Sequence, residues 1–237
     1  MTKNTQPDIY DPKFVENLFN KMSSSYGLTN YISSFGFTEK WRNQCINTLS
    51  TSTKDKVILD MMSGMGELWN SIYDKPKQVV GADISPKMNK KATSNSNKYD
   101  FPIEVVEQNI LENELDDESF DFVISSFGLK TFNTDQLRQL SKEVARILKT
   151  GGVFSFVEIS KPKSIFKIPF LFYLKIIIPI IGWMFMRNDN SYRFLGTYCS
   201  EFENCSKFKS FLEDEGLEVD FHSFFFGCAT GVSGLKK

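Results

Sequence analysis

Histidine and paired cysteines are scarce in this chain of 237 residues, and their scarcity excludes several kinds of site. His222 is the only histidine, and no two of the four cysteines follow C-x-x-C spacing. A zinc site built from Cys and His ligands is therefore not expected, and no other metal site is predicted. The simplest interpretation of the cysteines is that of reduced thiols in a cytoplasmic protein.

Excess charge of one sign is also missing, as is an apolar leader. The net charge is −1, so nucleic acid is not expected as a partner. The polar N-terminal residues contain no apolar signal core, which argues against secretion. A chain of 237 residues has room for one α/β domain, with or without a lid.

A glycine turn follows the first apolar run of the chain. Residues 57–66 read V-I-L-D-M-M-S-G-M-G, and a second apolar run, 78–82, ends in Asp83. The spacing from the turn to this acid is close to the roughly 20 residues expected when a carboxylate binds the ribose of a nucleotide. An ordinary strand–turn–helix connection remains the alternative.

The turn lacks the features of phosphate-binding sites. Trp69 stands where a dinucleotide fingerprint has its third glycine, and no Gly-Lys-Ser/Thr follows. An adenosine ligand without phosphates fits better, and S-adenosylmethionine is the common one. We therefore expect S-adenosylmethionine as the cofactor.

Strands and helices alternate from residue 56 onward. The predicted strands lie at about 56–60, 78–82, 103–107, 120–125 and 152–158, and the predicted helices near 66–73, 86–98 and 134–148. Ser85 is the predicted N-cap of the second of these helices, with Pro86 at its first position. Apolar runs of this kind are typical of buried parallel strands in a doubly wound sheet. Ligands of such sheets bind at the carboxyl ends of the strands, where Asp60, Asp83, Asn109 and Ser125-Ser126 would gather.

Two helices precede the first strand. Asp11-Pro12 predicts the start of one, and Thr38 is predicted as the N-cap of the other. Together they would form a cap, about 12–50, over the ligand site.

Residues 165–186 form a long apolar run that resembles a membrane span in length. Lys167, Lys175, Pro169 and Pro179 interrupt it, which disfavours a span. We predict a lid, about 161–200, that lines an apolar substrate pocket and touches the bilayer surface.

The tail predicts a helix around 203–215 and two strands, L-E-V-D-F-H-S and F-F-F-G-C-A-T-G. They are close enough to pair as an antiparallel hairpin at the edge of the sheet. His222 lies in this hairpin, and we interpret it as a packing or surface residue.

Four stretches carry a family resemblance: Y-G-L-T-N…S-F-G-F-T-E-K-W-R (26–42), S-F-G-L (126–129), V-E-I-S-K-P (157–162) and N-D-N-S-Y-R-F-L (188–195). With them the chain resembles class I S-adenosylmethionine-dependent methyltransferases, and more narrowly the ubiquinone/menaquinone C-methyltransferases. The resemblance implies one domain, 1–237, with a seven-stranded, mostly parallel sheet that ends in an antiparallel hairpin. It also implies methylation of a ring carbon of a prenylated quinol beside a hydroxyl.

The resemblance assigns the cofactor site. Asp60, Ser63, Gly64, Met65 and Gly66 would surround the methionine part, and Asp83 with Ile84 would hold the ribose. Asn109 and Ile110 would hold the adenine, and Ser126 would lie near the reactive end.

The chain departs from the family pattern beside the acceptor. Ser-Gly-Met-Gly replaces Gly-Gly-Thr-Gly, Lys130-Thr131 replaces Arg-Asn, and Tyr26-Gly27 replaces Tyr-Asp. A ring carbon becomes nucleophilic when the neighbouring hydroxyl loses its proton, which a cation or a general base promotes. The candidates for this role are Tyr26, Lys130, Asp189, Tyr192 and Arg193. Asp189 and Arg193 could instead form an i, i+4 pair on a helix.

Other functions stay open at this point. The acceptor could be another lipophilic molecule, such as a terpenoid or a secondary metabolite. A non-catalytic nucleoside-binding module and an integral membrane anchor are the alternatives from other classes. Contact with the inner face of the membrane and a homodimer are both compatible with the sequence.

Overall fold

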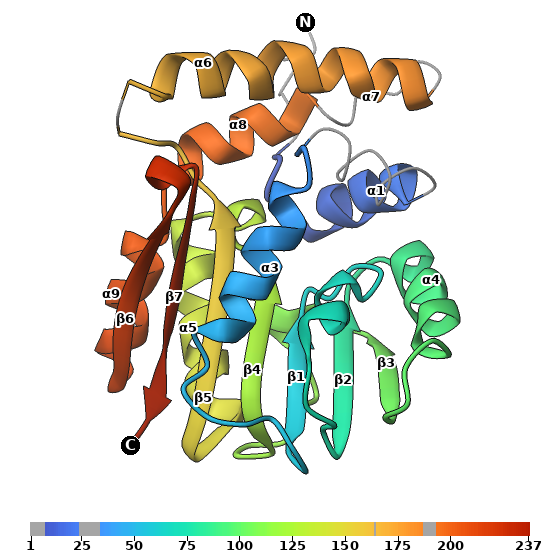
Figure 1. Ribbon diagram of the computed structural model, residues 1–237, viewed down its shortest axis with the longest axis vertical. Coiled ribbons are helices and arrows are strands. Elements are labelled where there is room, and N and C mark those ends of the chain that lie inside the picture. The colour runs from blue at the N-terminus through green and yellow to red at the C-terminus, as the bar shows by residue number, and fades with distance from the viewer. Residues whose placement is uncertain (1–7, 24–33, 164, 187–192) are drawn as a thin grey trace, which may run out of the picture.

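One sheet of seven strands organises the computed structural model, which describes residues 8–23, 34–163, 165–186 and 193–237. The strand order is β3-β2-β1-β4-β5-β7-β6 (Figure 1). The strands are β1 (Val57–Met61), β2 (Gln78–Asp83), β3 (Ile103–Glu107), β4 (Phe120–Ser126), β5 (Leu148–Ile159), β6 (Leu217–Phe224) and β7 (Ala229–Lys236). The predicted strands up to β5 are confirmed, each to within a few residues.

The parallel strands β1 to β5 bring their carboxyl ends to one edge of the sheet. β1 lies between β2 and β4, with Asp60 beside Gly81 on one side and Ile124 on the other. The chain order reverses between these neighbours, since β2 and β3 lie on one side of β1 and β4 and β5 on the other. Such a switch point is where doubly wound sheets bind ligands.

Helices cover both faces of the sheet and the edge where the parallel strands end (Figure 1). The helices are α1 (Pro12–Met22), α3 (Phe37–Asn47), α4 (Pro86–Ser96), α5 (Thr134–Ile147), α6 (Lys167–Phe172), α7 (Ile178–Met186), α8 (Arg193–Phe202) and α9 (Ser206–Asp214). On one face α5 and α9 pack together, and α3 and α4 pack against the other. Short helical turns connect them: η1 (Glu67–Ser71), η2 (Ile110–Glu112), η3 (Leu129–Thr131), η4 (Tyr173–Ile177, a π-turn) and η5 (Phe225–Gly227).

Two of the predicted helix starts are confirmed and one is wrong. The side chains of Asp11 and Ser85 cap α1 and α4. Thr38 lies inside α3 and not at its N-cap, which is Gly36 with φ +76°. The hydroxyl of Thr38 lies 2.9 Å from the Ser34 hydroxyl. Gly36 turns the chain into this helix, and Ser34 satisfies the first free amides: its carbonyl accepts from Phe37 N at 2.9 Å and its hydroxyl from Thr38 N at 3.4 Å.

The second strand of the C-terminal hairpin is not where the sequence predicted it. The aromatic run belongs to η5, where Phe225 and Phe226 both have positive φ, and β7 begins only at Ala229. β7 is buried between β5 and β6, to both of which it pairs antiparallel. A strand with neighbours on both sides favours the small, buried residues of 229–233 over exposed phenylalanines.

The apolar run 165–186 forms one rod. α6, η4 and α7 follow one another without a break and lie across the top of the molecule, with α8 beneath (Figure 1). Within the described parts of the chain, none of the helices combines the length and apolarity needed to cross a bilayer.

Candidate functional site

The glycine turn folds back onto the tip of β2. Met62, Gly64 and Gly66 all have positive φ, at +57°, +56° and +79°. Ser63 N donates to Ala82 O at 3.1 Å, and Gly66 N donates to Ser63 O at 2.9 Å. Alternate left-handed residues leave backbone N–H groups exposed along the turn, which suits close contact with a ligand.

Asp83 holds this turn. Its carboxylate accepts hydrogen bonds from Gly64 N at 2.9 Å and from Ser85 N at 2.8 Å. Burial raises the pKa of Asp83 to about 6, although both hydrogen bonds act in the opposite direction. A carboxylate has about four lone-pair sites, so two remain for a pair of ribose hydroxyls.

Trp69 explains the missing third glycine. The residue is fully buried in η1. A Cβ on Gly66 or on Gly81 of β2 would overlap the Trp69 side chain. Here the indole, not a third glycine, joins the turn to the sheet.

Asp60 lies beneath the turn with an incomplete set of partners. The side chain is 1% exposed, and its Oδ2 has no hydrogen-bond partner in the described structure. Burial and the nearby Glu67 carboxylate raise the pKa of Asp60 well above its ordinary value. Ser63 Oγ is also buried without a partner. Orphaned polar atoms of this kind are costly unless a ligand completes them.

A cavity of about 850 Å³, measured to its mouth, opens beside the turn; we call it the turn cavity. Seven of the predicted cofactor residues line it: Ser63, Gly64, Asp83, Ile84, Asn109, Ile110 and Ser126. The other three, Asp60, Met65 and Gly66, are not among its lining residues. The Asn109 side chain caps η2 by accepting from Leu111 N at 3.2 Å.

Acidic groups dominate the turn cavity. Glu67 and Asp83 line it, with Asp60 behind them, and Arg42 is the only basic residue among its described lining residues. Phosphates would be repelled by the carboxylates that line the cavity, whereas a ligand with a cationic centre would be attracted. The residues therefore fit a phosphate-free, positively charged adenosine compound.

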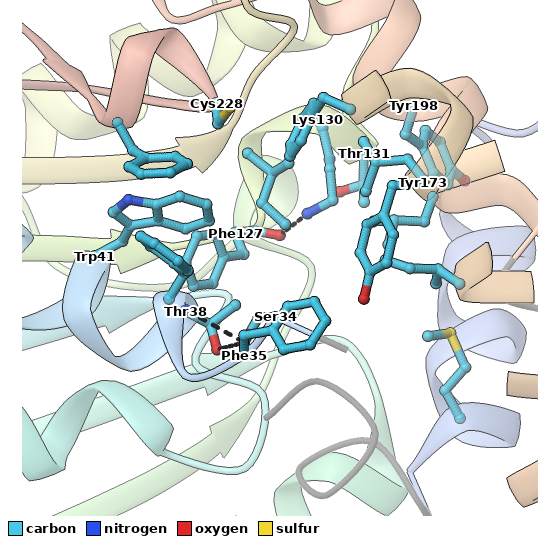
Figure 2. A pocket seen from close by; sticks show the side chains of 18 of the residues that line it. Ser34, Phe35, Thr38, Trp41, Phe127, Lys130, Thr131, Tyr173, Tyr198 and Cys228 are labelled. Carbon is cyan, nitrogen blue, oxygen red and sulfur yellow. Dashed lines mark hydrogen bonds between the residues drawn. The ribbon is translucent and has the colours of Figure 1, made fainter. Parts of the chain in front are cut away.

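A second cavity, of about 1140 Å³ to its mouth, adjoins the first; we call it the apolar cavity (Figure 2). Trp41 and Phe127 line it together with side chains from the rod, such as Tyr173. Phe19, Phe127 and Thr131 line both cavities. The two spaces are thus separated by the thickness of a few side chains.

Phe127 forms part of this wall in a strained conformation. It follows β4 with φ +65°, which is unusual for a bulky residue. Its amide donates to Val157 O at 2.8 Å, and its ring makes an edge contact with Trp41. Backbone strain held in this way is typical of functional positions.

Lys130 lines the apolar cavity but is already paired. Its ammonium lies 3.0 Å from Glu158 Oε1 and also donates to the carbonyl of Phe127, while its amide donates to Glu158 Oε2 at 3.0 Å. Both side chains are buried, at 5% and 0% exposure. Glu158 offsets the charge that Lys130 was predicted to direct at the acceptor.

Of the remaining predicted catalytic residues, Arg193 alone lies within the described part of the chain. Tyr26, Asp189 and Tyr192 lie outside the described residues, so their roles stay predictions. Arg193 is exposed at the start of α8 and lines neither cavity. His222 is half-buried and bonds Ser233 of the neighbouring strand at 2.7 Å, in agreement with a packing role.

Sequence reasoning missed four residues of the site: Arg42, Glu67, Phe127 and Glu158. Glu67 follows the glycine turn directly, and Arg42 ends one of the stretches that carry the family resemblance. These two sequence positions were the signals that could have identified Glu67 and Arg42 as site residues. The contacts themselves join residues far apart in the chain and could not be read from spacing.

Comparison with known proteins gives the family of the chain. A sequence model of the ubiE/COQ5 methyltransferase family matches residues 6–236. The chain is 28% identical over 228 residues to a demethylmenaquinone methyltransferase of Bacillus licheniformis, covering 94% of this chain and 97% of that protein. It is also 28% identical over 231 residues to one of Thermotoga maritima, with 92% and 93% covered.

Solved structures show the same fold at low identity. Magnesium protoporphyrin IX methyltransferase of Synechocystis PCC 6803, solved with bound S-adenosylhomocysteine, has a TM-score of 0.62 at 14% identity, covering 96% of this chain and 100% of its own. The N-methyltransferase NodS of Bradyrhizobium japonicum, also solved with S-adenosylhomocysteine, has a TM-score of 0.58 at 13% identity, with 84% and 86% covered. These likenesses show the class I methyltransferase fold.

Proposed function

The chain belongs to the ubiE/COQ5 methyltransferase family, and we propose that it methylates a ring carbon of a prenylated quinol. It is an S-adenosylmethionine-dependent methyltransferase. The proposed acceptor is of the demethylmenaquinol type, because the relatives cited above are named demethylmenaquinone methyltransferases. The single observation that carries the proposal is the apolar cavity, which shares Phe19, Phe127 and Thr131 with the turn cavity.

The proposed cofactor site is the turn cavity. When bound, S-adenosylmethionine supplies a methyl group activated on a sulfonium. Asp83 would accept from the ribose hydroxyls, Asn109 and Ile110 would border the adenine, and Ser126 would lie near the reactive end. The task of the chain is alignment, and well-oriented reactants can take about 7–11 kcal/mol off a barrier.

The apolar cavity supports a hydrophobic acceptor. Its lining is mostly aromatic and aliphatic, with few polar groups that could fix a ring. Lys130 and Thr131 stand beside the shared wall, and we propose that the paired Lys130 orients an acceptor hydroxyl as a hydrogen-bond donor. The negative charge of Glu158 nearly cancels the positive charge of Lys130. The pair would therefore stabilise a phenolate less than an unpaired cation would.

The helices around the cavities support a cap and a lid. Residues of α1 and α3, within the predicted cap 12–50, line both cavities, and the rod within the predicted lid 161–200 lines the apolar one. We propose that the outer face of the rod contacts the membrane surface. A prenylated acceptor resides in the bilayer, so a pocket at that surface could receive it without passage through water.

A second acceptor class remains a candidate on one observation. Lys130-Thr131 stands where relatives of this family usually have Arg-Asn, and both residues line the apolar cavity. A different polar pair beside the ring favours a different pattern of hydroxyls. The alternative acceptor is another lipophilic small molecule.

Label transfer tests the proposal. Purified protein is incubated with methyl-labelled S-adenosylmethionine and a reduced demethylmenaquinone in detergent micelles, and lipids are examined by mass spectrometry. We expect labelled product heavier by one methylene, and none with Asp83→Ala. Label in another lipid of a cell extract would identify the second acceptor class. No label in any lipid, with S-adenosylhomocysteine still bound, would leave only a binding module.

A further inference from the structure

Arg42 of α3 lines the turn cavity together with Asp83 and Glu67. It is 9% exposed, and its Nη2 lies 3.7 Å from Oε1 of Glu67. Its guanidinium carbon lies 5.2 Å from the centre of the Phe127 ring, in a cation–π arrangement. Arg42 therefore touches both the glycine-turn side of the site and the wall shared with the apolar cavity.

Glu67 is fixed against the glycine turn. Its Oε2 accepts from Met65 N at 3.3 Å, and a Cβ on Gly64 would lie 3.2 Å from the same oxygen. The carboxylate thus covers the turn at close range, and only a glycine at position 64 gives it an ordinary contact distance.

The charges of Arg42 and Glu67 are buried but incompletely bonded. A separation of 3.7 Å is an ionic contact but too long for a hydrogen bond. Arg42 Nε and Glu67 Oε1 are both buried without a hydrogen-bond partner in the described structure. Buried charged groups left in this state are costly, so the arrangement is suited to being completed by a ligand.

We propose that Arg42 and Glu67 together bind the amino-acid end of the cofactor, Arg42 the carboxylate and Glu67 the ammonium. The inference rests on the proposed function and adds two binding residues to it. A zwitterion carries one charge of each sign, which is what an unsatisfied Arg–Glu pair requires. The adenosine part of the cofactor, by contrast, has no charge that could pair with either residue.

Three ligands separate this role from a structural one. S-adenosylhomocysteine has both charges, its decarboxylated form keeps the amine alone, and 5′-methylthioadenosine lacks both. All three share the adenosine that Asp83 would bind. Binding is measured by calorimetry on the full chain, so the readout does not depend on methyl transfer.

Each variant has its own expected pattern. Arg42→Met should weaken S-adenosylhomocysteine binding on the order of 30-fold or more, and leave the other two ligands within about twofold of the wild type. Glu67→Gln should weaken both amine-bearing ligands and spare 5′-methylthioadenosine. Arg138→Met, at an exposed arginine paired with Asp214 at 3.2 Å, is the matched control and should change nothing.

The outcomes separate the two proposals. Equal losses for all three ligands in Arg42→Met would show that the arginine merely supports the fold, and no loss for S-adenosylhomocysteine would show that it does not bind the carboxylate. Either result overturns the inference and leaves the methyltransferase proposal intact. If the wild type bound none of the three ligands, the proposed function itself would fail.

Discussion

Asp83 is the residue whose protonation should govern cofactor affinity. Burial raises its pKa to about 6, so the acid becomes protonated as the pH falls through 6. The protonated acid accepts fewer hydrogen bonds and is neutral, so it would bind ribose hydroxyls less well. The stability of the ligand-free protein depends on pH in the opposite direction. Because the pKa of Asp83 is raised in the folded state, protonation of this acid stabilises the fold.

We predict that S-adenosylhomocysteine affinity falls between about pH 7.5 and about pH 5, by up to roughly tenfold per unit below the pKa. Calorimetry across this range measures it. Asp83→Asn should bind weakly at every pH and lose most of the pH dependence. The pKa of the neighbouring Asp60 is also raised, so an unchanged slope in Asp83→Asn would assign the titration to Asp60.

The neighbours of Lys130 in the fold change the role that its charge can have. In the sequence Lys130 is a cation beside a family motif, and its predicted role was to stabilise a phenolate. In the fold its ammonium has a carboxylate partner 3.0 Å away in Glu158. The predicted catalytic role remains a prediction, now for a paired donor.

At the scale of elements, the glycine turn depends on what packs beneath it. Gly66 and Gly151 have nearly the same positive φ, at +79° and +78°. A Cβ on Gly151 would meet nothing within 4 Å, whereas one on Gly66 would overlap the Trp69 indole. The two glycines therefore separate backbone strain from steric overlap.

We predict that Gly151→Ala costs about 1–2 kcal/mol of unfolding free energy, from the left-handed backbone alone. Gly66→Ala should cost a further 1–3 kcal/mol or so through overpacking, and should also weaken cofactor binding. Urea denaturation and calorimetry measure both effects. Equal losses of stability would mean that Trp69 moves aside without cost.

The rod formed by α6, η4 and α7 presents apolar side chains on two opposite faces. Phe170, Leu174 and Ile178 line the apolar cavity. The outer face carries a stripe at helical spacing, which we call the outer stripe: Ile165, Ile168, Phe172, Ile176, Ile180 and Trp183. A helix with apolar side chains on all its faces is normally buried on all of them. The exposed outer stripe is therefore a candidate contact surface.

For the whole molecule, the outer stripe predicts where it docks. Phe225 and Phe226, exposed at η5, extend the apolar surface, and Phe226 stacks on Phe166 beside the rod. Residues 160–186 contain lysines but no acidic residue. Apolar side chains with basic neighbours are typical of surfaces that bind anionic bilayers.

We predict that the protein binds vesicles containing anionic lipid, and binds neutral vesicles less. The double substitution Ile168→Glu/Ile176→Glu should abolish binding, because both residues are exposed in the stripe, and should leave S-adenosylhomocysteine affinity unchanged. Tyr73→Glu, also at an exposed residue but outside the stripe, is the control. Vesicle co-sedimentation measures the binding. The wild type could instead form a dimer and not bind vesicles. If the double substitution then abolished the dimer, the stripe would be assigned to contact with a second copy of the chain.

Much of this protein was determined by the sequence alone. The five parallel strands, the N-caps Asp11 and Ser85, and the convergence of Asp83, Asn109 and Ser126 on one cavity all followed from spacing. Each depends on local chemistry: a strand needs a short apolar run, a cap needs one side chain, and parallel strands end at one edge.

Tertiary structure alone decided the rest. The position of β7, the Arg42–Glu67 contact, the Lys130–Glu158 pair and the wall at Phe127 join segments that lie far apart in the chain. Such contacts depend on distances in space, which residue spacing does not encode. The same holds for the apolar run at 165–186: its composition predicted a lid that lines an apolar pocket and touches the bilayer surface, and only packing determined which face borders the apolar cavity and which stays exposed.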